Sequence, residues 1–130
     1  MNSSVIIIDD NQDLTEVFSL FFSLKSINVL AVGRNGKDAI KLYEKYKPNV
    51  VVMDFQMPDF DGLYGVENIK KINPNAKIIL LTGSTGKRLF KKFTELGISA
   101  IIQKPCDMDN LVELINKISK SDAIRLNSLS

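Results

Sequence analysis

The chain of 130 residues contains no histidine, no tryptophan and one cysteine, Cys106. Without histidine, serine–histidine and cysteine–histidine catalysis and most zinc sites are excluded. A single cysteine cannot form an intramolecular disulfide, so we expect a protein of the reducing cytoplasm. No apolar run approaches the roughly 20 residues that span a bilayer. Because the first residues also lack the features of a signal peptide, we expect no membrane contact.

The chain also has little excess charge of either sign, with a formal net charge of +2 at pH 7. Such a small excess of positive charge does not indicate nucleic-acid binding, and no helix-turn-helix pattern follows residue 120. We therefore expect no direct contact with nucleic acid in this chain. The apolar content of 45% and the charged content of 25% are those of an ordinary globular domain. We expect one domain over residues 1–120, followed at 121–130 by a polar tail or the start of a linker.

Short apolar runs, mostly of β-branched residues and leucine, recur along the chain. They occupy residues 5–8, 50–53, 78–81 and 98–102, with a weaker run at 28–32. The runs are continuous rather than alternating, which is typical of strands buried on both faces of a parallel sheet.

Apolar residues also recur at helical spacing between these runs, and we expect these stripes to face the core. The stripes are Leu14, Val17, Phe18 and Phe21; Ala39, Leu42, Tyr43 and Tyr46; Leu63, Val66 and Ile69; Leu89, Phe93 and Leu96; and Leu111, Leu114, Ile115 and Ile118. Strands and helices therefore alternate as (βα)₅, which predicts a doubly wound α/β fold with right-handed crossovers. Ligands in such folds bind beyond the carboxyl ends of the strands.

Polar residues follow the predicted strands at those ends. Asp9 and Asp10 follow the first strand, Asp54 the third, Thr82 the fourth and Lys104 the fifth. Each has an ordinary explanation by itself: helix capping for the first two and for the threonine, a turn for Asp54, and a solvated surface charge for the lysine.

Their convergence at one edge of a parallel sheet changes that interpretation. Two carboxylates 4 Å apart repel each other by about 4 kcal/mol at an effective dielectric constant of 20. Three acids near one lysine therefore favour a bound cation, and oxygen ligands alone indicate Mg²⁺ or a relative such as Mn²⁺. An aspartate in such a site is also a possible nucleophile toward phosphorus, which would give an acyl phosphate.

These motifs resemble the receiver domain of two-component response regulators, a chemotaxis-regulator-like family. The matching segments are Asp9-Asp10, Asp54-Phe-Gln-Met-Pro58, Asp61-Gly62, Thr82-Gly83 and Lys104-Pro105, in the family's order and at its spacing. The resemblance covers residues 4 to about 120. It implies a flavodoxin-like five-stranded parallel sheet in the order 2-1-3-4-5.

The resemblance also implies a role for each matching residue. Asp54 would accept the phosphoryl group, and Thr82 and Lys104 would hold its oxygens. Mg²⁺ would be bound directly by Asp10 and Asp54, through water by Asp9, and by the backbone carbonyl of Gln56. The Lys104–Pro105 peptide bond would be a candidate for the cis form. The protein would catalyse only its own phosphorylation and dephosphorylation, and would not be an enzyme for other substrates.

The partners implied by the resemblance are a sensor histidine kinase or phosphotransfer protein and an output protein. The output protein would bind the face made by the fourth helix, fifth strand and fifth helix. The fourth helix carries Lys87, Arg88, Lys91 and Lys92 opposite its apolar stripe, which suggests an acidic partner, although a solvated helix face is the simpler explanation.

Two positions depart from the family pattern. Ile101 stands where a switching aromatic is common, and Cys106 stands where phenylalanine is common. Because isoleucine is stiff at χ1, we expect weak coupling of the fifth strand to Asp54, with changes centred on the loop after Thr82.

Three other interpretations compete with that of a phosphorylated receiver domain. A phosphatase with an aspartyl nucleophile would need a second acid where Gln56 stands, and a flavin module would need a phosphate loop where the acidic residues 9–13 stand. The third is a degenerate receiver that binds partners without phosphorylation, which Ile101 keeps open.

Overall fold

The computed structural model describes residues 2–83 and 87–121, which form five strands and five helices in strict alternation. The strands are β1 (Ser4–Ile8), β2 (Asn28–Gly33), β3 (Val50–Asp54), β4 (Ile78–Thr82) and β5 (Ala100–Gln103). The helices are α1 (Gln12–Leu24), α2 (Gly36–Tyr46), α3 (Gly62–Ile72), α4 (Lys87–Glu95) and α5 (Met108–Lys120).

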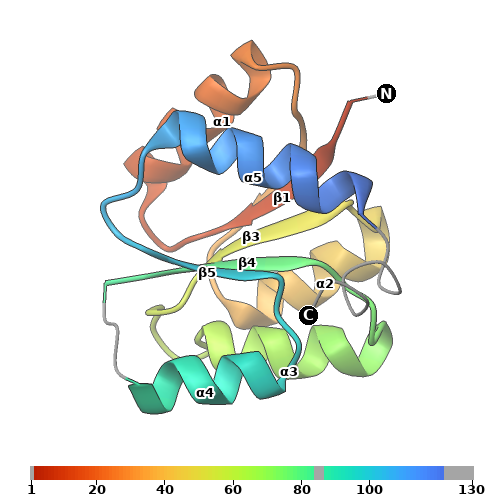
Figure 1. Cartoon of the computed structure of the whole chain (residues 1–130), viewed down its shortest axis with the longest axis vertical. Coiled ribbons are helices and arrows are strands. Elements are labelled where there is room, and N and C mark those ends of the chain that lie inside the picture. Colours follow the sequence, from red (N-terminus) through yellow and green to blue (C-terminus); the bar gives the residue numbers. More distant parts are fainter. Residues whose placement is uncertain (1, 84–86, 122–130) are drawn as a thin grey trace.

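The strands form one parallel sheet in the order β2-β1-β3-β4-β5, which confirms the fold expected from the sequence. Helices α1 and α5 cover one face of the sheet, and α2, α3 and α4 cover the other (Figure 1). The strand order reverses between β1 and β3, so the carboxyl ends of these two strands flank the place where ligands bind in folds of this kind.

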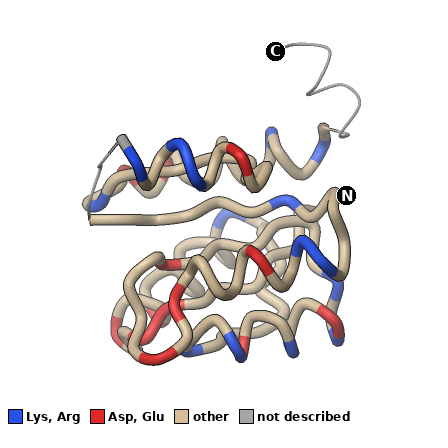
Figure 2. The backbone as a smooth tube through the Cα atoms, turned by 90° about the horizontal axis from the view of Figure 1, so that it is seen from below, with Lys and Arg blue, Asp and Glu red and all other residues tan. Residues whose placement is uncertain are grey.

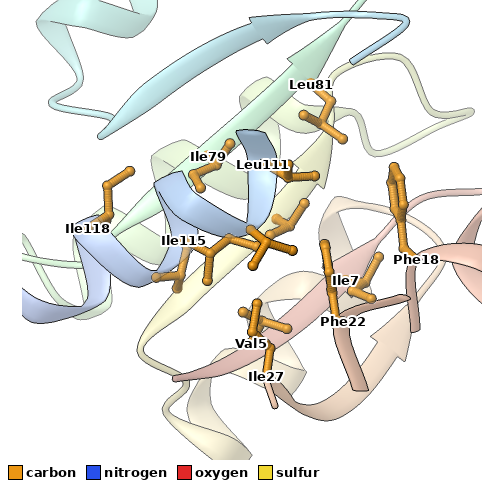
Figure 3. Close-up of a cluster of buried hydrophobic side chains, with 13 residues drawn as sticks. Val5, Ile7, Phe18, Phe22, Ile27, Ile79, Leu81, Leu111, Ile115 and Ile118 are labelled. Carbon is orange, nitrogen blue, oxygen red and sulfur yellow. The ribbon is translucent and has the colours of Figure 1, made fainter. Parts of the chain in front are cut away.

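The central strands are buried on both sides, and successive side chains belong to different cores. Val5 and Ile7 of β1 pack with α1 and α5 (Figure 3), whereas Ile6 and Ile8 pack on the opposite face with α2 to α4. All four of these side chains are buried. This double burial explains why the strands appear as continuous apolar runs rather than as alternating patterns.

Several helices begin with a side-chain cap at the carboxyl end of the preceding strand. The capping residues are Asn11, Asn35, Asp61 and Asp107, each of which accepts a hydrogen bond from a backbone N–H in the first turn. Such caps stabilise a helix by about 1 kcal/mol. They also fix the loops that surround the strand ends.

Gly65 allows α3 to approach the sheet closely. A Cβ atom at this position would lie 2.7 Å from Met53 Sδ, closer than side-chain packing permits. A side chain at this position would therefore push α3 away from β3.

Three details differ from the sequence predictions. β5 begins at Ala100 rather than at residue 98, because Ile98 N–H bonds back to the Phe93 carbonyl in the turn that ends α4. That turn contains Gly97 in the left-handed region, at φ 78°. Val17 and Tyr46 were expected to face the core, but both are exposed. In α1 the fully buried side chains are Thr15, Phe18 and Phe22, and Leu14 and Phe21 are partly buried against the same core.

Among residues 2–83 and 87–121, no helix combines the length and the apolar character needed to cross a membrane.

Candidate functional site

Three carboxylates meet at the carboxyl end of the sheet. Asp9 and Asp10 follow β1, and Asp54 is the last residue of β3, the neighbouring strand. One carboxylate oxygen from each lies within 4.8 Å of the others. Asp9 and Asp54 are 2% and 6% exposed, whereas Asp10 is exposed. Figure 2 shows this end of the molecule (left) as a concentration of acidic positions.

Lys104 bridges two of these acids. Its Nζ lies 2.9 Å from Asp54 Oδ1 and 3.4 Å from Asp9 Oδ2. The lysine follows β5 at the edge of the sheet, and its side chain is partly buried. It is therefore a component of the acidic site and not a solvated surface charge.

The β1–α1 loop holds Asp9 in place for this contact. Asp9 Oδ1 accepts a hydrogen bond from Asn11 N–H at 2.9 Å, and Asp9 N–H donates to the Gly33 carbonyl at 3.1 Å. The N-cap of α1 is supplied by Asn11, whose Oδ1 accepts from Leu14 N–H. Capping of α1 therefore does not account for the acids, which remain directed to the site.

Thr82 lies beside this group at the end of β4. It is 1% exposed, and its carbonyl accepts a hydrogen bond from Lys104 N–H at 2.8 Å. This hydrogen bond holds the start of the β5–α5 loop next to the end of β4. The Lys104–Pro105 peptide bond in that loop is cis, the form that the family resemblance implies.

Burial and ion pairing shift two pKa values in the site. Burial raises the pKa of Asp54, the hydrogen bond from Lys104 opposes this, and the charge of Asp9 adds to the rise, with a net upward shift. For Lys104, burial lowers the pKa, but the hydrogen bond and charge of Asp54, with the charge of Asp9, outweigh it and leave the pKa raised. The lysine is therefore a fixed positive charge at neutral pH.

The β3–α3 loop forms the remaining wall. Gln56 is exposed and lines an open pocket together with Phe55, Met57, Pro58 and Asp61. Asp61 caps α3 and accepts from Tyr64 N–H at 3.0 Å. Asp61, which belongs to one of the matching motifs, therefore caps α3 and is not one of the three clustered carboxylates.

The two departures from the family pattern lie near the site. Ile101, in β5, is partly buried and packs on the side of the sheet covered by α2 to α4. Cys106, in the β5–α5 loop, is partly buried against the opposite core. Gly83, which follows Thr82, is exposed, and part of the loop in which changes were expected lies outside the described residues.

Sequence reasoning missed one residue of the site, Arg34. It follows β2 directly, and its Nη1 donates hydrogen bonds to the Asp9 carbonyl at 3.2 Å and to Thr15 Oγ1 at 3.0 Å. The other site residues were found because they follow a predicted strand. Arg34 follows the weakest predicted strand, so the same criterion identifies it.

The chain matches the model of the response regulator receiver domain over residues 5–116. It therefore belongs to that family, as the motifs indicated. Its relatives include the chemotaxis protein CheY of Thermotoga maritima, 31% identical over 92% of this chain and 100% of that protein. Another is the response regulator protein VraR of Staphylococcus saprophyticus, 30% identical over 95% of this chain but only 60% of that longer protein.

Solved structures agree with this assignment. A DNA-binding response regulator of the LuxR family from Staphylococcus aureus is 34% identical, with a TM-score of 0.83 over 91% of this chain and 99% of the other. CheY in the CheX–CheY–BeF₃–Mg²⁺ complex from Borrelia burgdorferi has the same fold, with a TM-score of 0.85 at 22% identity over 92% of this chain and 90% of the other.

The raised pKa of Asp54 predicts a stability change in metal-free protein. Its folded-state pKa lies above the ordinary value of 3.8, so ionisation of Asp54 disfavours the folded state. This penalty is absent below the ordinary pKa and grows as pH rises through the folded value. Asp54→Asn should therefore be more stable than wild type toward urea at pH 7 in chelator, and its advantage should shrink as pH falls toward 3.8.

The control is Asp13→Asn, an exposed carboxylate of α1 whose removal should change stability by no more than about 0.5 kcal/mol. An Asp54→Asn protein less stable than wild type at pH 7 would show that the Lys104 ion pair outweighs the cost of burial.

Proposed function

We propose that this receiver domain accepts a phosphoryl group on Asp54 from the phosphohistidine of a sensor histidine kinase or phosphotransfer protein. The observation that carries the proposal is the contact of Lys104 with Asp54 and Asp9 inside a cluster of three carboxylates. The result would be a change in a protein-binding surface, as part of two-component signal transduction. The domain would act on itself only, and we propose no other substrate.

The donor set fits Mg²⁺ or Mn²⁺. Asp9, Asp10 and Asp54 offer three carboxylate oxygens close enough together for one ion, and no nitrogen or sulfur ligand is among them. We propose that these residues and the Gln56 backbone carbonyl hold the ion, with Asp9 acting through water. When bound, the cation would neutralise charge on the transferring phosphoryl group.

The chain's own residues supply the rest of the chemistry. A carboxylate oxygen of Asp54 attacks phosphorus, the P–N bond to the donor imidazole breaks, and its electron pair remains on that nitrogen. The product is an acyl phosphate on Asp54. The Lys104 ammonium, already 2.9 Å from Asp54, would stabilise the negative charge on the phosphoryl oxygens, and we propose that the Thr82 hydroxyl donates to one of them.

Phosphorylation can be tested with acetyl phosphate and Mg²⁺. We expect an acid-stable, base-labile adduct on Asp54, detected by mass spectrometry, and no adduct when a chelator removes the metal. Asp54→Asn should remain unmodified. Asp61→Asn is the matched control, because asparagine caps a helix as well as aspartate does, and it should be modified like wild type.

If Asp54→Asn is modified to the same extent as wild type, the assignment of Asp54 as the phosphoacceptor is wrong. Absence of both metal binding and modification in wild type would favour the degenerate receiver, a binding scaffold that does not need phosphorylation.

Helix α1 offers a surface to a protein donor. It starts directly after the acidic loop, and Val17, Leu20 and Leu24 are 57%, 65% and 73% exposed along its outer side. Adjacent exposed apolar side chains of this kind mark protein contacts. Asp54 is buried at the carboxyl end of the sheet, so a protein donor must cover that end to reach it. We propose that the donor protein also contacts α1, which begins there.

Leu20→Glu should slow phosphoryl transfer from a phosphorylated histidine phosphotransfer domain by about tenfold or more, because a charge would be placed in an apolar contact. The reaction with acetyl phosphate, which needs no docking, should be unchanged. Phe90→Glu is the control, since Phe90 is similarly exposed, at 60%, but lies on α4. Equal slowing by both variants would contradict docking on α1.

The output surface is proposed to be the face of α4, β5 and α5. β5 is an edge strand and lies between α4 and α5 (Figure 1). Helix α4 packs through Phe93 and exposes Arg88, Lys91 and Lys92. An acidic output partner suits this face.

Replacing Lys91 and Lys92 with glutamate should weaken the binding of an acidic output partner by about tenfold, because exposed ion pairs contribute about 0.2–1 kcal/mol each. Wild-type affinity should fall with added salt, and the variant should lose this dependence. Reversal of Lys41 and Lys45 on α2 makes the same change in net charge and is the control. Unchanged affinity after reversal on α4 would exclude this face.

We propose that the receiver unit ends with α5 near residue 120 and that residues 121–130 are a tail or the start of a linker. The cap on α5 at Ser121 supports this boundary. A cytoplasmic location is proposed because the donor and the single reduced cysteine both fit that compartment.

A further inference from the structure

Arg34 connects the end of β2 to the loop that carries Asp9 and Asp10. Its side chain is partly buried, and one guanidinium nitrogen donates both to the Asp9 carbonyl and to Thr15 Oγ1. Both acceptors belong to the β1–α1 segment, one in the acidic loop and one in the first turns of α1. The arginine therefore joins the end of β2 both to the acidic loop and to the first turns of α1.

The geometry of each contact is suited to a fixed connection. Thr15 is 1% exposed, and its hydroxyl donates its one proton to the Gln12 carbonyl at 2.8 Å, so its lone pairs are directed to accept from Arg34. Asp9 N–H bonds to the Gly33 carbonyl, and the Asp9 carbonyl accepts from Arg34. The peptide groups on both sides of the Asp9 side chain are thus tied to the end of β2.

Arg34 is itself held from behind. Its backbone N–H donates to Asp38 Oδ2 at 2.8 Å, and Asp38 N–H donates to Asn35 Oδ1 at 2.9 Å. These bonds fix Arg34 to the capped N-terminus of α2. A planar guanidinium on such a support loses little further freedom when it forms its contacts.

We propose that Arg34 is a positioning residue for metal binding at the carboxylate cluster. It keeps the Asp9 and Asp10 loop in the conformation that binds the cation, against the mutual repulsion of the carboxylates. The inference rests on the proposed function, because it assumes that the cluster binds Mg²⁺ or Mn²⁺.

Charge and positioning predict opposite results when Arg34 is replaced. As a nearby positive charge, the guanidinium repels a metal cation, so its removal would strengthen metal binding by electrostatics alone. As a positioning group, its removal would weaken binding. A loss of affinity on removing a positive charge therefore cannot come from electrostatics.

The experiment is a Mn²⁺ titration of the full chain, with free Mn²⁺ measured by electron paramagnetic resonance. Arg34→Ala should bind Mn²⁺ about tenfold more weakly than wild type, the usual effect of losing a group that orients metal ligands. Lys37→Ala is the matched control: it removes an equal charge from the start of α2, where Lys37 is exposed over the Phe60 ring. It should bind Mn²⁺ as tightly as wild type or slightly more tightly.

Kinetics separate positioning from general damage to the fold. With acetyl phosphate, Arg34→Ala should need about ten times more Mn²⁺ for half-maximal rate, yet reach the wild-type rate at saturation. Arg34→Lys, which can donate to one acceptor at least, should lie between alanine and wild type in both measurements.

Two results would overturn the inference. In the first, Arg34→Ala binds Mn²⁺ as tightly as wild type. In the second, its maximal rate falls at every Mn²⁺ concentration without a shift in the half-saturating value. If wild type itself binds no Mn²⁺, the proposed function fails and this inference fails with it, a result that the wild-type titration identifies before any variant is compared.

Discussion

The site depends on one electrostatic constraint: three carboxylates share one end of a parallel sheet with a single ammonium group. Lys104 contacts Asp54 and Asp9 but leaves the cluster with excess negative charge. Parallel strands impose this convergence, because all their carboxyl ends lie at the same edge. The rest of the fold offsets the cost of assembling the acids, and binding of the proposed cation would reduce that cost.

The two cores supply the rigidity that this arrangement needs. β1 and β3, which carry the acids, are buried over almost their whole length, with side chains packed alternately into the cores on either face. The loops beyond them are fixed by local bonds, such as Asn11 at the start of α1 and Arg34 behind Asp9. Carboxylates that repel one another are therefore mounted on a part of the molecule that cannot easily move them apart.

The sequence predicts the residues that lie at the ends of the strands, but it does not predict which side of a helix faces the core. Continuous apolar runs locate buried strands, and the residues after them include Asp9, Asp54, Thr82 and Lys104. Val17 was assigned to the core because it fits the helical period, but a helix with apolar residues on more than one side does not reveal which side is buried. Arg34 was missed because it follows the weakest apolar run, at 28–32, and the rule that selects residues at strand ends was applied only to the stronger runs. Its contacts, with a backbone carbonyl and a threonine hydroxyl, leave no charge pattern in the sequence.

The sequence also does not predict which side chains connect the carboxylate site to α4. Ile101 lacks the aromatic ring common in the family, and the sequence alone offers no replacement for it. In the structure, Phe55 directly follows Asp54, and its ring meets that of Phe93 edge-on, with centroids 5.5 Å apart and an interplanar angle of 87°. Phe93 is fully buried and belongs to α4, whose opposite side carries the exposed lysines. Aromatic pairs in this geometry contribute about 0.5–1.5 kcal/mol beyond their burial. The residue next to the proposed phosphoacceptor therefore has a specific packing contact with the helix of the proposed output face. That contact does not involve the β5 position at which the family aromatic is missing.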